Sequence, residues 1–333
     1  MNGREANRYE FFVNDFGARG DGTTDDTRAI QEAIDQAGEA RGTVVFPEAA
    51  YACSRLRVPA DVWLVGRARW SYANSADRSA LILRDPDAPC LLDLTEAYGA
   101  VVQGLQLTVD HCRVETFPSD GIRFEWVWCV SIRHTHVFRN GGCGLRYRGW
   151  DAFLLDNWFS DNGGAGFGAY DENAAVTFSG NRLEWNRQGG MDVHGGDGYL
   201  VNGNFFDNNG RFSLRLLPRD GGWHHTYNVT GNVFRRGASR NWHTEPDDAG
   251  VILDGARGLI FVANTLVSGR GLDQSGDCSE YAPAVALRLR NLDESVVKDN
   301  VLHLGATSCL IADQGGHGTQ FVLRDNPGSL RRE

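Results

Sequence analysis

The stretch that decides the fold is GNRLEWNRQGGMDVH, residues 180–194. An Asn followed by large apolar residues leads into a polar Asn turn, and a Gly then opens a short strand. Successive side chains of a strand point to opposite faces, so Met191 and Val193 share one face while Asp192 and His194 share the other. The alternation predicts that the apolar pair faces a core and that the acid and the imidazole face outward together.

The same unit returns between residues 120 and 328. Its Asn anchors are Asn157, Asn181, Asn204, Asn232, Asn264 and Asn300. The spacing between consecutive anchors is 24, 23, 28, 32 and 36 residues, so insertions accumulate toward the C-terminus. A repeat of this length is typical of a solenoid, in which each coil stacks on the one before it. We expect the recurrent Asn to form an inward-facing ladder of side-chain amides at one turn.

The strands that follow each turn can be aligned with one another. They begin at residues 121, 144, 166, 190, 213, 250, 286 and 309, and their expected inward pairs are Leu145 and Tyr147, Phe167 and Ala169, Met191 and Val193, Leu214 and Leu216, and Val251 and Leu253. No segment of helical period separates them, which argues against β-α-β units. The sequence therefore predicts an all-β, single-stranded parallel β-helix.

The N-terminal segment VNDFGARGDGTTDDTRAIQEAIDQAG, residues 13–38, predicts a strand, a Gly-rich turn and one amphipathic α-helix. Thr24 or Asp25 is expected to cap the helix. Its apolar stripe consists of Ala29, Ile30, Ala33, Ile34 and Ala37. Such a helix is expected to close the open end of the solenoid, which otherwise exposes its core.

This segment resembles the start of the pectate-lyase-like right-handed parallel β-helix proteins, many of which open with DFGA-x-GDG-x-x-DDT, a helix and a G-T-V-x-x-P strand. The resemblance implies a right-handed solenoid in one domain over residues 1–333, with the N-terminal strand and capping helix at 11–40, coils at 41–328 and a tail at 329–333. Lyases, hydrolases, epimerases, fructan-cyclising enzymes and phage tailspikes share the segment. We therefore interpret its acidic residues as architecture and not as catalytic carboxylates.

Composition excludes several partners. The net charge of −10 disfavours nucleic acid, which requires a basic face, and no apolar stretch is long enough to span a membrane. Seven cysteines without a C-x-x-C pair and an N-terminus without an apolar leader suggest a cytoplasmic protein, or a secreted one if a leader has been removed. An oligo- or polysaccharide is the expected partner, and self-association into a homo-oligomer is left open.

The outward positions of the aligned strands form two columns, because equivalent residues of successive coils lie about 4.8 Å apart. The first column is Arg123, Arg146, Gly168, Asp192, Arg215, Ile252, Arg288 and Ile311; the second is Glu125, Arg148, Tyr170, His194, Leu217, Asp254, Arg290 and Asp313. Basic, acidic and aromatic residues concentrate in the middle coils. We expect the absent side chain at Gly168 to leave a notch for a sugar ring.

These residues suit proton abstraction beside a carboxylate. His194 provides a base that titrates near neutrality, and Arg215 provides charge for the enolate-like intermediate. Tyr170 on the adjacent coil is the candidate acid, and Arg146 and Arg148 are candidate substrate-binding residues. The sequence thus predicts a lyase or epimerase acting at C5 of a uronate.

The segment GMDVHGGD also resembles the G-F-D-P-H-[DE] strand of mannuronan C5-epimerases. The resemblance implies that Gly190, Asp192 and His194 correspond to the Gly, Asp and His of that strand. Gly189 stands where that family has Tyr, Val193 replaces its Pro, and Gly195 replaces the acid after His. The resemblance therefore implies epimerase chemistry only if Tyr170 replaces the missing Tyr.

Two alternatives remain open. A glycoside hydrolase, or a glycosyl or fructosyl transferase, needs two carboxylates across the bond. Asp171 or Glu172 could pair with Asp192, and Asp254 is a third candidate. The other alternative is a non-catalytic saccharide-binding or tailspike-like solenoid.

Two long insertions, 235–249 and 268–283, are expected to border the groove. Trp223 and Trp242 in the loops could stack on sugar rings, or they could cover the flank of the solenoid. No cofactor or metal is expected, because the adjacent His224 and His225 direct their side chains apart. Asp247–Asp248 is an alternative calcium ligand pair.

Overall fold

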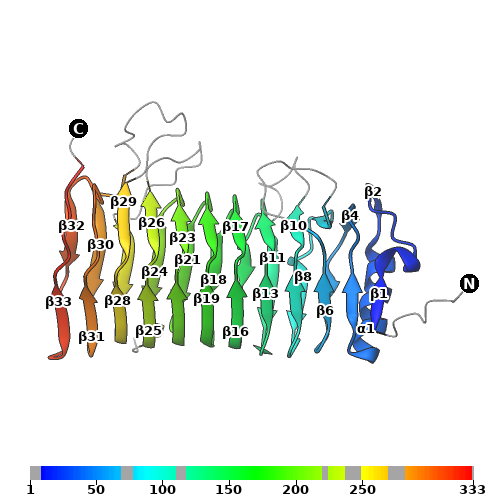
Figure 1. The fold of residues 1–333 in the computed structure, drawn as a ribbon, viewed down its shortest axis with the longest axis horizontal. Helices are drawn as coiled ribbons and strands as arrows, with labels where there is room; N and C mark the ends of the chain where they lie inside the picture. The colour runs from blue at the N-terminus through cyan, green and yellow to red at the C-terminus, as the bar shows by residue number, and fades with distance from the viewer. Residues whose placement is uncertain are drawn as a thin grey trace, which may run out of the picture.

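The computed structural model describes residues 9–68, 78–109, 118–219, 224–236, 249–268 and 282–331 of the 333-residue chain. The chain winds as stacked coils along one long axis, with its two ends at opposite ends of the molecule (Figure 1). Among the described residues, no helix has the length and apolarity that a membrane crossing requires.

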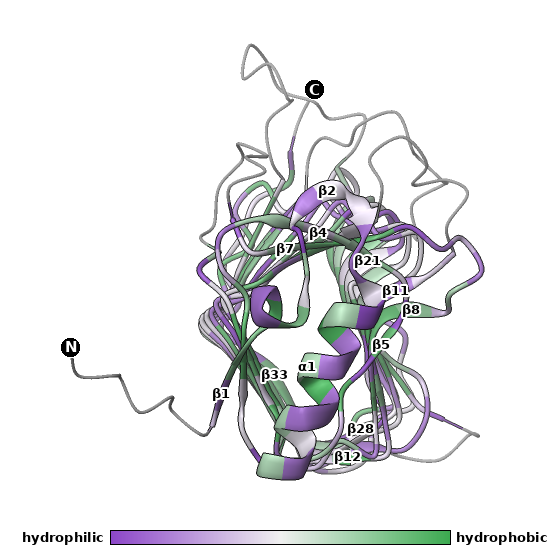
Figure 2. Cartoon of the chain, turned by 90° about the vertical axis from the view of Figure 1, so that its right-hand side faces the viewer, coloured by the Kyte–Doolittle hydropathy of each residue, from purple (hydrophilic) through white to green (hydrophobic). Residues whose placement is uncertain are grey.

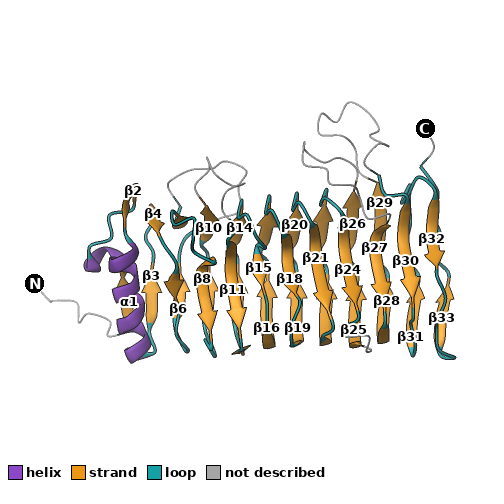
Figure 3. Cartoon of the chain, turned by 180° about the vertical axis from the view of Figure 1, so that it is seen from behind, coloured by secondary structure: helices purple, strands orange, loops and turns teal. Residues whose placement is uncertain are grey.

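Three parallel sheets run the length of the solenoid, and the middle coils contribute a strand to each (Figure 3). Sheet A contains β1 (Glu10–Phe12), β3 (Thr43–Val45), β6 (Trp63–Val65), β9 (Val101–Gln103), β12 (Val127–Trp128), β13 (Ser131–Arg133), β16 (Gly149–Leu155), β19 (Asn173–Ser179), β22 (Asp197–Asn202), β25 (His224–Thr230), β28 (Ala256–Val262), β31 (Ser295–Lys298) and β33 (Phe321–Arg324). Sheet B contains β2 (Asp21–Asp25), β4 (Ala50–Cys53), β7 (Ala80–Leu83), β10 (Gln106–Val109), β14 (His136–Phe138), β17 (Trp158–Ser160), β20 (Arg182–Glu184), β23 (Phe205–Asp207), β26 (Val233–Arg236) and β29 (Thr265–Ser268). Sheet C contains β5 (Leu56–Arg57), β8 (Cys90–Thr95), β11 (Asp120–Glu125), β15 (Leu145–Arg146), β18 (Ala165–Ala169), β21 (Gly189–His194), β24 (Phe212–Leu217), β27 (Ala249–Asp254), β30 (Val285–Arg290) and β32 (Cys309–Asp313).

The predicted β-helix and its inward face are confirmed. Met191 and Val193 of β21 are fully buried, as are the aligned pair Leu214 and Leu216 of β24. The other predicted inward pairs on sheet C are also buried. Because every coil places such side chains on the same side, one continuous apolar core runs inside the three sheets.

The predicted Asn ladder lies at the turn between sheets A and B. Each amide in it accepts from the preceding rung and donates to the next, as Asn181 does when its Nδ2 donates to Asn204 Oδ1 at 3.1 Å. The same Nδ2 also donates to the Leu154 carbonyl oxygen, at 2.8 Å. The ladder extends one coil beyond the prediction, to Asn326. Buried backbone groups at this turn are thus satisfied without water.

A second ladder, which the sequence argument did not assign as one, lies at the turn between sheets B and C. It consists of Asn140, Asn162, Asn186 and Asn209, and all four are buried. Asn162 Nδ2, for example, donates to Asn186 Oδ1 at 2.9 Å. The two ladders hold the coils in register on both edges of sheet B.

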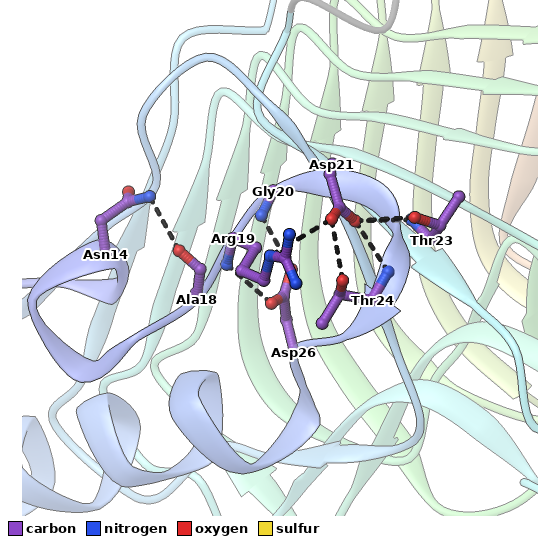
Figure 4. A network of polar contacts seen from close by, with 8 residues as sticks. All are labelled: Asn14, Ala18, Arg19, Gly20, Asp21, Thr23, Thr24 and Asp26. Carbon is purple, nitrogen blue, oxygen red and sulfur yellow. Dashed lines mark hydrogen bonds and ion pairs between the residues drawn. The ribbon is translucent and has the colours of Figure 1, made fainter.

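The acidic residues of the N-terminal segment bind backbone, as expected for architecture (Figure 4). Asp26 accepts hydrogen bonds from the backbone N–H groups of Arg19 and Gly20, at 2.7 and 3.0 Å. Asp21 accepts from the backbone N–H and the hydroxyl of both Thr23 and Thr24. These hydrogen bonds lower the pKa of Asp21 below its ordinary value.

Helix α1 (Thr27–Ala40) lies across the N-terminal opening of the solenoid, preceded by the short 3₁₀ helix η1 (Val13–Phe16) (Figure 2). Ile30, Ala33, Ile34 and Ala37 are fully buried against the core, so the predicted stripe and plug are confirmed. The predicted cap was placed too early, because the N-cap is Asp26 and its side chain makes no capping hydrogen bond. Asp25 instead accepts from the Thr27 backbone N–H at 3.0 Å.

The outward column of sheet C has the predicted register from β11 to β30. Neighbours along it include Arg146 and Gly168, Gly168 and Asp192, and Asp192 and Arg215. The register predicted for the last coil is wrong by one residue. Arg288 lies opposite Ala312, not Ile311, and Asp313 lies opposite Leu289, not Arg290. The error follows from the composition of the last strand: Cys309, Leu310, Ile311 and Ala312 are all apolar, so alternation does not fix which of them faces outward.

Candidate functional site

Asp192 and Arg215 form an ion pair between β21 and β24, which are neighbours on sheet C (Figure 3). Arg215 Nε donates to Asp192 Oδ1 at 2.9 Å, and Arg215 Nη2 donates to Asp192 Oδ2 at 2.8 Å. Asp192 is only 1% exposed, and its burial alone would raise the pKa of the carboxyl group. The hydrogen bonds from Arg215 and His194 outweigh burial and hold that pKa below its ordinary value. Asp192 is therefore an anion at neutral pH.

His194 ends β21 and faces outward beside this pair. Its Nε2 lies 3.2 Å from Asp192 Oδ1, and 31% of its side chain is exposed. An ionised carboxylate only accepts hydrogen bonds, so it selects the tautomer that carries the proton on Nε2. Nδ1 then keeps its lone pair, and it has no hydrogen-bond partner among the described residues. The arrangement leaves a half-exposed imidazole ready to accept a proton.

Tyr170 follows β18 on the preceding coil, and its ring meets His194 edge-on with 5.2 Å between ring centroids. The expected notch at Gly168 is absent, because Tyr170 fills it. A Cβ at Gly168 would lie 2.7 Å from Tyr170 Oη, and the hydroxyl lies 3.7 Å from Cys143 Sγ. Burial is the main cause that raises the pKa of Tyr170 well above its ordinary value, and the nearby Cys143 and Asp192 raise it further. The phenol therefore keeps its proton.

Arg146 and Arg148 lie one coil before Tyr170, toward the N-terminus, and they have different surroundings. Arg146 has its guanidinium carbon 5.4 Å from the Tyr170 ring centroid, and it has no carboxylate partner among the described residues. Arg148 is held between Glu125 and Glu172, with nitrogen–oxygen distances of 2.6 and 2.9 Å. Arg146 is thus the cation that can meet an anionic substrate.

Apart from Asp171, the carboxylates expected for glycoside hydrolysis are held by other partners. Glu172 pairs with Arg148, and a backbone hydrogen bond together with the neighbouring guanidinium groups lowers its pKa. Asp171 is exposed beside it. Asp254 lies two coils beyond His194, and its Oδ1 accepts from Asn291 Nδ2 at 3.0 Å. A glycosidase also needs a carboxylic acid whose pKa is raised, whereas the pKa values of Asp192 and Glu172 are lowered.

Several predicted residues lie outside the described part of the chain. They are Trp223, Trp242 and the Asp247–Asp248 pair, together with most of the two long insertions. His224 is buried and its neighbour His225 is exposed, so their side chains point apart as predicted. Within the described ranges, no group of three or more His, Cys, Asp and Glu side chains is arranged to hold a metal ion.

The structure adds two features that sequence reasoning missed. One is a stack of aromatic rings beside Arg148, whose signal in the sequence is the W-x-W of Trp126 and Trp128 with Trp150 one coil later. The other is a buried acidic pair on sheet B, Glu184 opposite Asp207. Burial raises the pKa of Asp207 to about 6. Alternating polar residues on sheet B were the available signal for that pair.

Two family models match consecutive parts of the chain. Residues 11–84 match rhamnogalacturonase A/epimerase, pectate lyase-like, and residues 95–209 match the right handed beta helix region. Both matches agree with the three parallel sheets and the plugged N-terminal end. The chain is a pectate lyase-like right-handed β-helix.

Curated relatives of this β-helix match it over short stretches. Alginate lyase 7 of Azotobacter vinelandii is 47% identical over 66 residues, which cover 17% of this chain and 8% of that protein. Mannuronan C5-epimerase AlgE3 of the same organism is 53% identical over 53 residues, which cover 16% of this chain and 3% of that protein. The β-helix thus spans only a small part of the length of either relative.

Solved structures show the same fold over nearly the whole chain. The A-module of the Azotobacter vinelandii mannuronan C-5 epimerase AlgE4 has a TM-score of 0.57 at 18% identity, covering 96% of this chain and 100% of that one. The DFA-IIIase of Arthrobacter chlorophenolicus A6 in complex with GF2 has a TM-score of 0.61 at 14% identity, covering 94% and 93%. PfbA, a surface adhesin of Streptococcus pneumoniae, has a TM-score of 0.60 at 12% identity, covering 94% and 81%. At these identities the likeness concerns the fold alone.

Proposed function

We propose that this β-helix is a carbohydrate-active enzyme that removes the C5 proton of a uronate residue in an oligo- or polysaccharide. The observation that carries the proposal is the chain of contacts from Arg215 through Asp192 to a half-exposed His194. A buried anion that orients an imidazole and stabilises its protonated form is the arrangement that general-base catalysis requires.

In the proposed reaction, His194 Nδ1 takes the C5 proton and the C5–H electron pair moves into the adjacent carboxylate. The added negative charge needs a cation, and Arg146 supplies one that has no carboxylate partner among the described residues. Asp192 and Arg215 act through His194 as positioning residues, because Asp192 is almost wholly buried. The imidazolium that forms is stabilised by the Asp192 anion.

The intermediate can then follow either of two courses. In a lyase, the electron pair returns to form a double bond and expels the oxygen at C4, which takes a proton from an acid. In an epimerase, C5 accepts a proton on the opposite face and no glycosidic bond breaks. Tyr170 is our candidate acid for the lyase course, because its raised pKa keeps the phenol protonated and its ring contacts His194 on the same face of the sheet.

The short matches to an alginate lyase and to a mannuronan C5-epimerase support a uronate polymer as the substrate class. Polymannuronate and polygalacturonate are therefore the first substrates to test. Three readouts separate the reactions: ultraviolet absorbance of an unsaturated uronate for a lyase, deuterium incorporation at C5 without cleavage for an epimerase, and reducing ends without that absorbance for a hydrolase.

His194→Ala is expected to lower the rate by at least about 100-fold while the circular dichroism spectrum is unchanged. Asp254→Asn, two coils away on the same sheet, is the matched control and should keep most of the activity. Turnover of His194→Ala at the wild-type rate would overturn the proposed site. Binding of a polymer with none of the three readouts would identify a saccharide-binding solenoid in place of an enzyme.

A further inference from the structure

A stack of aromatic side chains follows the edge of sheet C where its strands turn toward sheet A. Trp126 stacks on Trp150 with 5.7 Å between ring centroids, and Trp150 stacks on Trp128 at 4.9 Å. Tyr98, one coil earlier, contacts Trp128 at 5.2 Å. We call these four residues the aromatic strip.

The backbone is built to hold the strip together. Trp128 and Trp150 lie opposite each other in the β12–β16 pairing. The coils approach closely here because Gly149, with φ of +150°, has no side chain; a Cβ would lie 2.4 Å from the Val127 carbonyl oxygen. Trp126 has a left-handed backbone, with φ of +56°, which is uncommon for a bulky residue. Its ring is held between Trp150 and the Arg148 guanidinium, which lies 3.9 Å from the ring centroid.

The strip is partly exposed to solvent, whereas an aromatic stack that only stabilises the fold would be buried. Tyr98 is 43% exposed and Trp126 is 37% exposed, while Trp128 and Trp150 are half-buried. Because the rings stack on one another, the strip presents a row of apolar ring edges to solvent. Such a row can contact the apolar C–H groups of a sugar while the sugar hydroxyls stay in water.

The strip is continuous with the candidate site. Arg148, which covers one end of the strip, pairs with Glu172 on the following coil. Glu172 lies two residues after Tyr170, and Tyr170 touches His194. With about 4.8 Å per coil, the strip begins about 10 Å and ends about 19 Å from the His194 coil, toward the N-terminal helix.

We infer that the aromatic strip binds the saccharide chain several residues away from the sugar that reacts at His194. This inference rests on the proposed function. It adds a direction to the substrate, which extends from His194 toward the N-terminal coils, and it requires a chain long enough to span the intervening coils. Arg146 belongs to the same coil as Trp150, so the cation proposed for the reacting carboxylate lies between His194 and the rest of the strip.

The test is binding of oligomannuronates of about two and about eight residues, since a dimer at His194 ends before the strip, which begins about 10 Å away, and only the longer oligomer reaches it. Affinities are measured by calorimetry in the His194→Ala background, so that ligand is not consumed. The longer oligomer is expected to bind at least about tenfold more tightly than the shorter one. Trp126→Ala should remove that advantage and leave the affinity for the short oligomer unchanged.

Tyr98→Ala, at the exposed end of the strip, is the second variant and should weaken binding of the long oligomer alone. Trp63→Ala removes a still more exposed ring, from the outer face of sheet A, and should change neither affinity. Unchanged denaturation midpoints show that the variants fold. If both strip variants bind the long oligomer as tightly as the parent, the inference is overturned. If the enzyme turns over uronates but its affinity is independent of length, only this inference fails; if wild type neither binds nor converts either oligomer, the proposed function fails with it.

Discussion

Arg215, on the coil after Asp192, donates two hydrogen bonds to the Asp192 carboxylate. The two side chains differ in their exposure to solvent. The Asp192 side chain is 2% exposed and that of Arg215 is 21% exposed. The pair neutralises a buried charge and also fixes the carboxylate oxygen that His194 contacts. Stability and the geometry of the candidate site therefore depend on the same contact.

Arg215→Met should destabilise the folded chain by about 3 kcal/mol at pH 7, because it leaves a buried carboxylate without its cation. The pKa of Asp192 is lowered in the folded state, so the pair stabilises above the unfolded pKa of 3.8 and the effect is lost as pH falls through the lower folded value. Urea denaturation at neutral and acidic pH measures this. The double variant with Asp192→Leu should recover most of the loss, and an unchanged single variant at pH 7 would contradict the prediction.

Gly168→Ala should displace Tyr170, because the new Cβ would lie 2.7 to 2.9 Å from three atoms of that side chain. Crowding of this kind costs about 1–3 kcal/mol. We expect the rate on the responsive uronate substrate to fall at least about tenfold, since a displaced Tyr170 loses its contact with His194. Gly250→Ala on the same sheet, where the nearest atoms would lie at 3.3 and 3.4 Å, is the control. Wild-type turnover by Gly168→Ala would show that the position of Tyr170 is unimportant.

Asp207→Asn should stabilise the chain at pH 7 and have little effect near pH 4. Burial raises the pKa of Asp207 from 3.8 to about 6, so the folded state holds the proton more tightly than the unfolded state does. The contribution of this carboxyl to stability is therefore fully present below 3.8 and is lost as pH rises through about 6, a difference of about 3 kcal/mol. Denaturation midpoints at the two pH values test the prediction. Asp299→Asn, on the exposed surface, should show no such pH dependence, and a loss of stability in Asp207→Asn at pH 7 would refute it.

Asn204→Ala should destabilise the β-helix by about 3 kcal/mol or more, because its amide joins three coils. Its Oδ1 accepts from the backbone and side chain of Asn181, and its Nδ2 donates to Phe178 and Asn232. The buried amide and carbonyl groups that lose these partners cannot form replacement hydrogen bonds with water. Asn326→Ala, at the half-buried end of the ladder, should cost much less. Equal losses in chemical denaturation would show that position in the ladder does not matter.

Much of the fold could be predicted because its signals are local and periodic. The alternation in β21 and the spacing of the Asn anchors place each coil, and the N-terminal segment supplies the plug. The register from Arg146 to Arg215 followed from the same alternation. The last coil was misaligned at Ile311 because Cys309 to Ala312 are all apolar, so the strand carries no alternation that fixes its register.

The candidate site could be predicted only in part. The alternation of side chains along β21 predicted that Asp192 and His194 both point outward. The contact between them depends on side-chain rotamers, which the alternation does not determine. Tyr170 folds back over Gly168, which turned an expected notch into a packed surface. The aromatic strip was missed because its rings come from three coils and meet only after the coils stack.

The sequence by itself determined that the chain coils, which residues point inward, and which coils are neighbours, since strand alternation and repeat spacing are properties of the chain alone. Tertiary structure decided which groups are neutralised, covered or left open. Arg215 forms an ion pair with Asp192, and Arg148 forms ion pairs with two glutamates. Arg146 has no carboxylate partner among the described residues. The physical reason is that coils lie about 4.8 Å apart, so each side chain has several possible partners on neighbouring coils. Packing and charge determine which of these contacts forms.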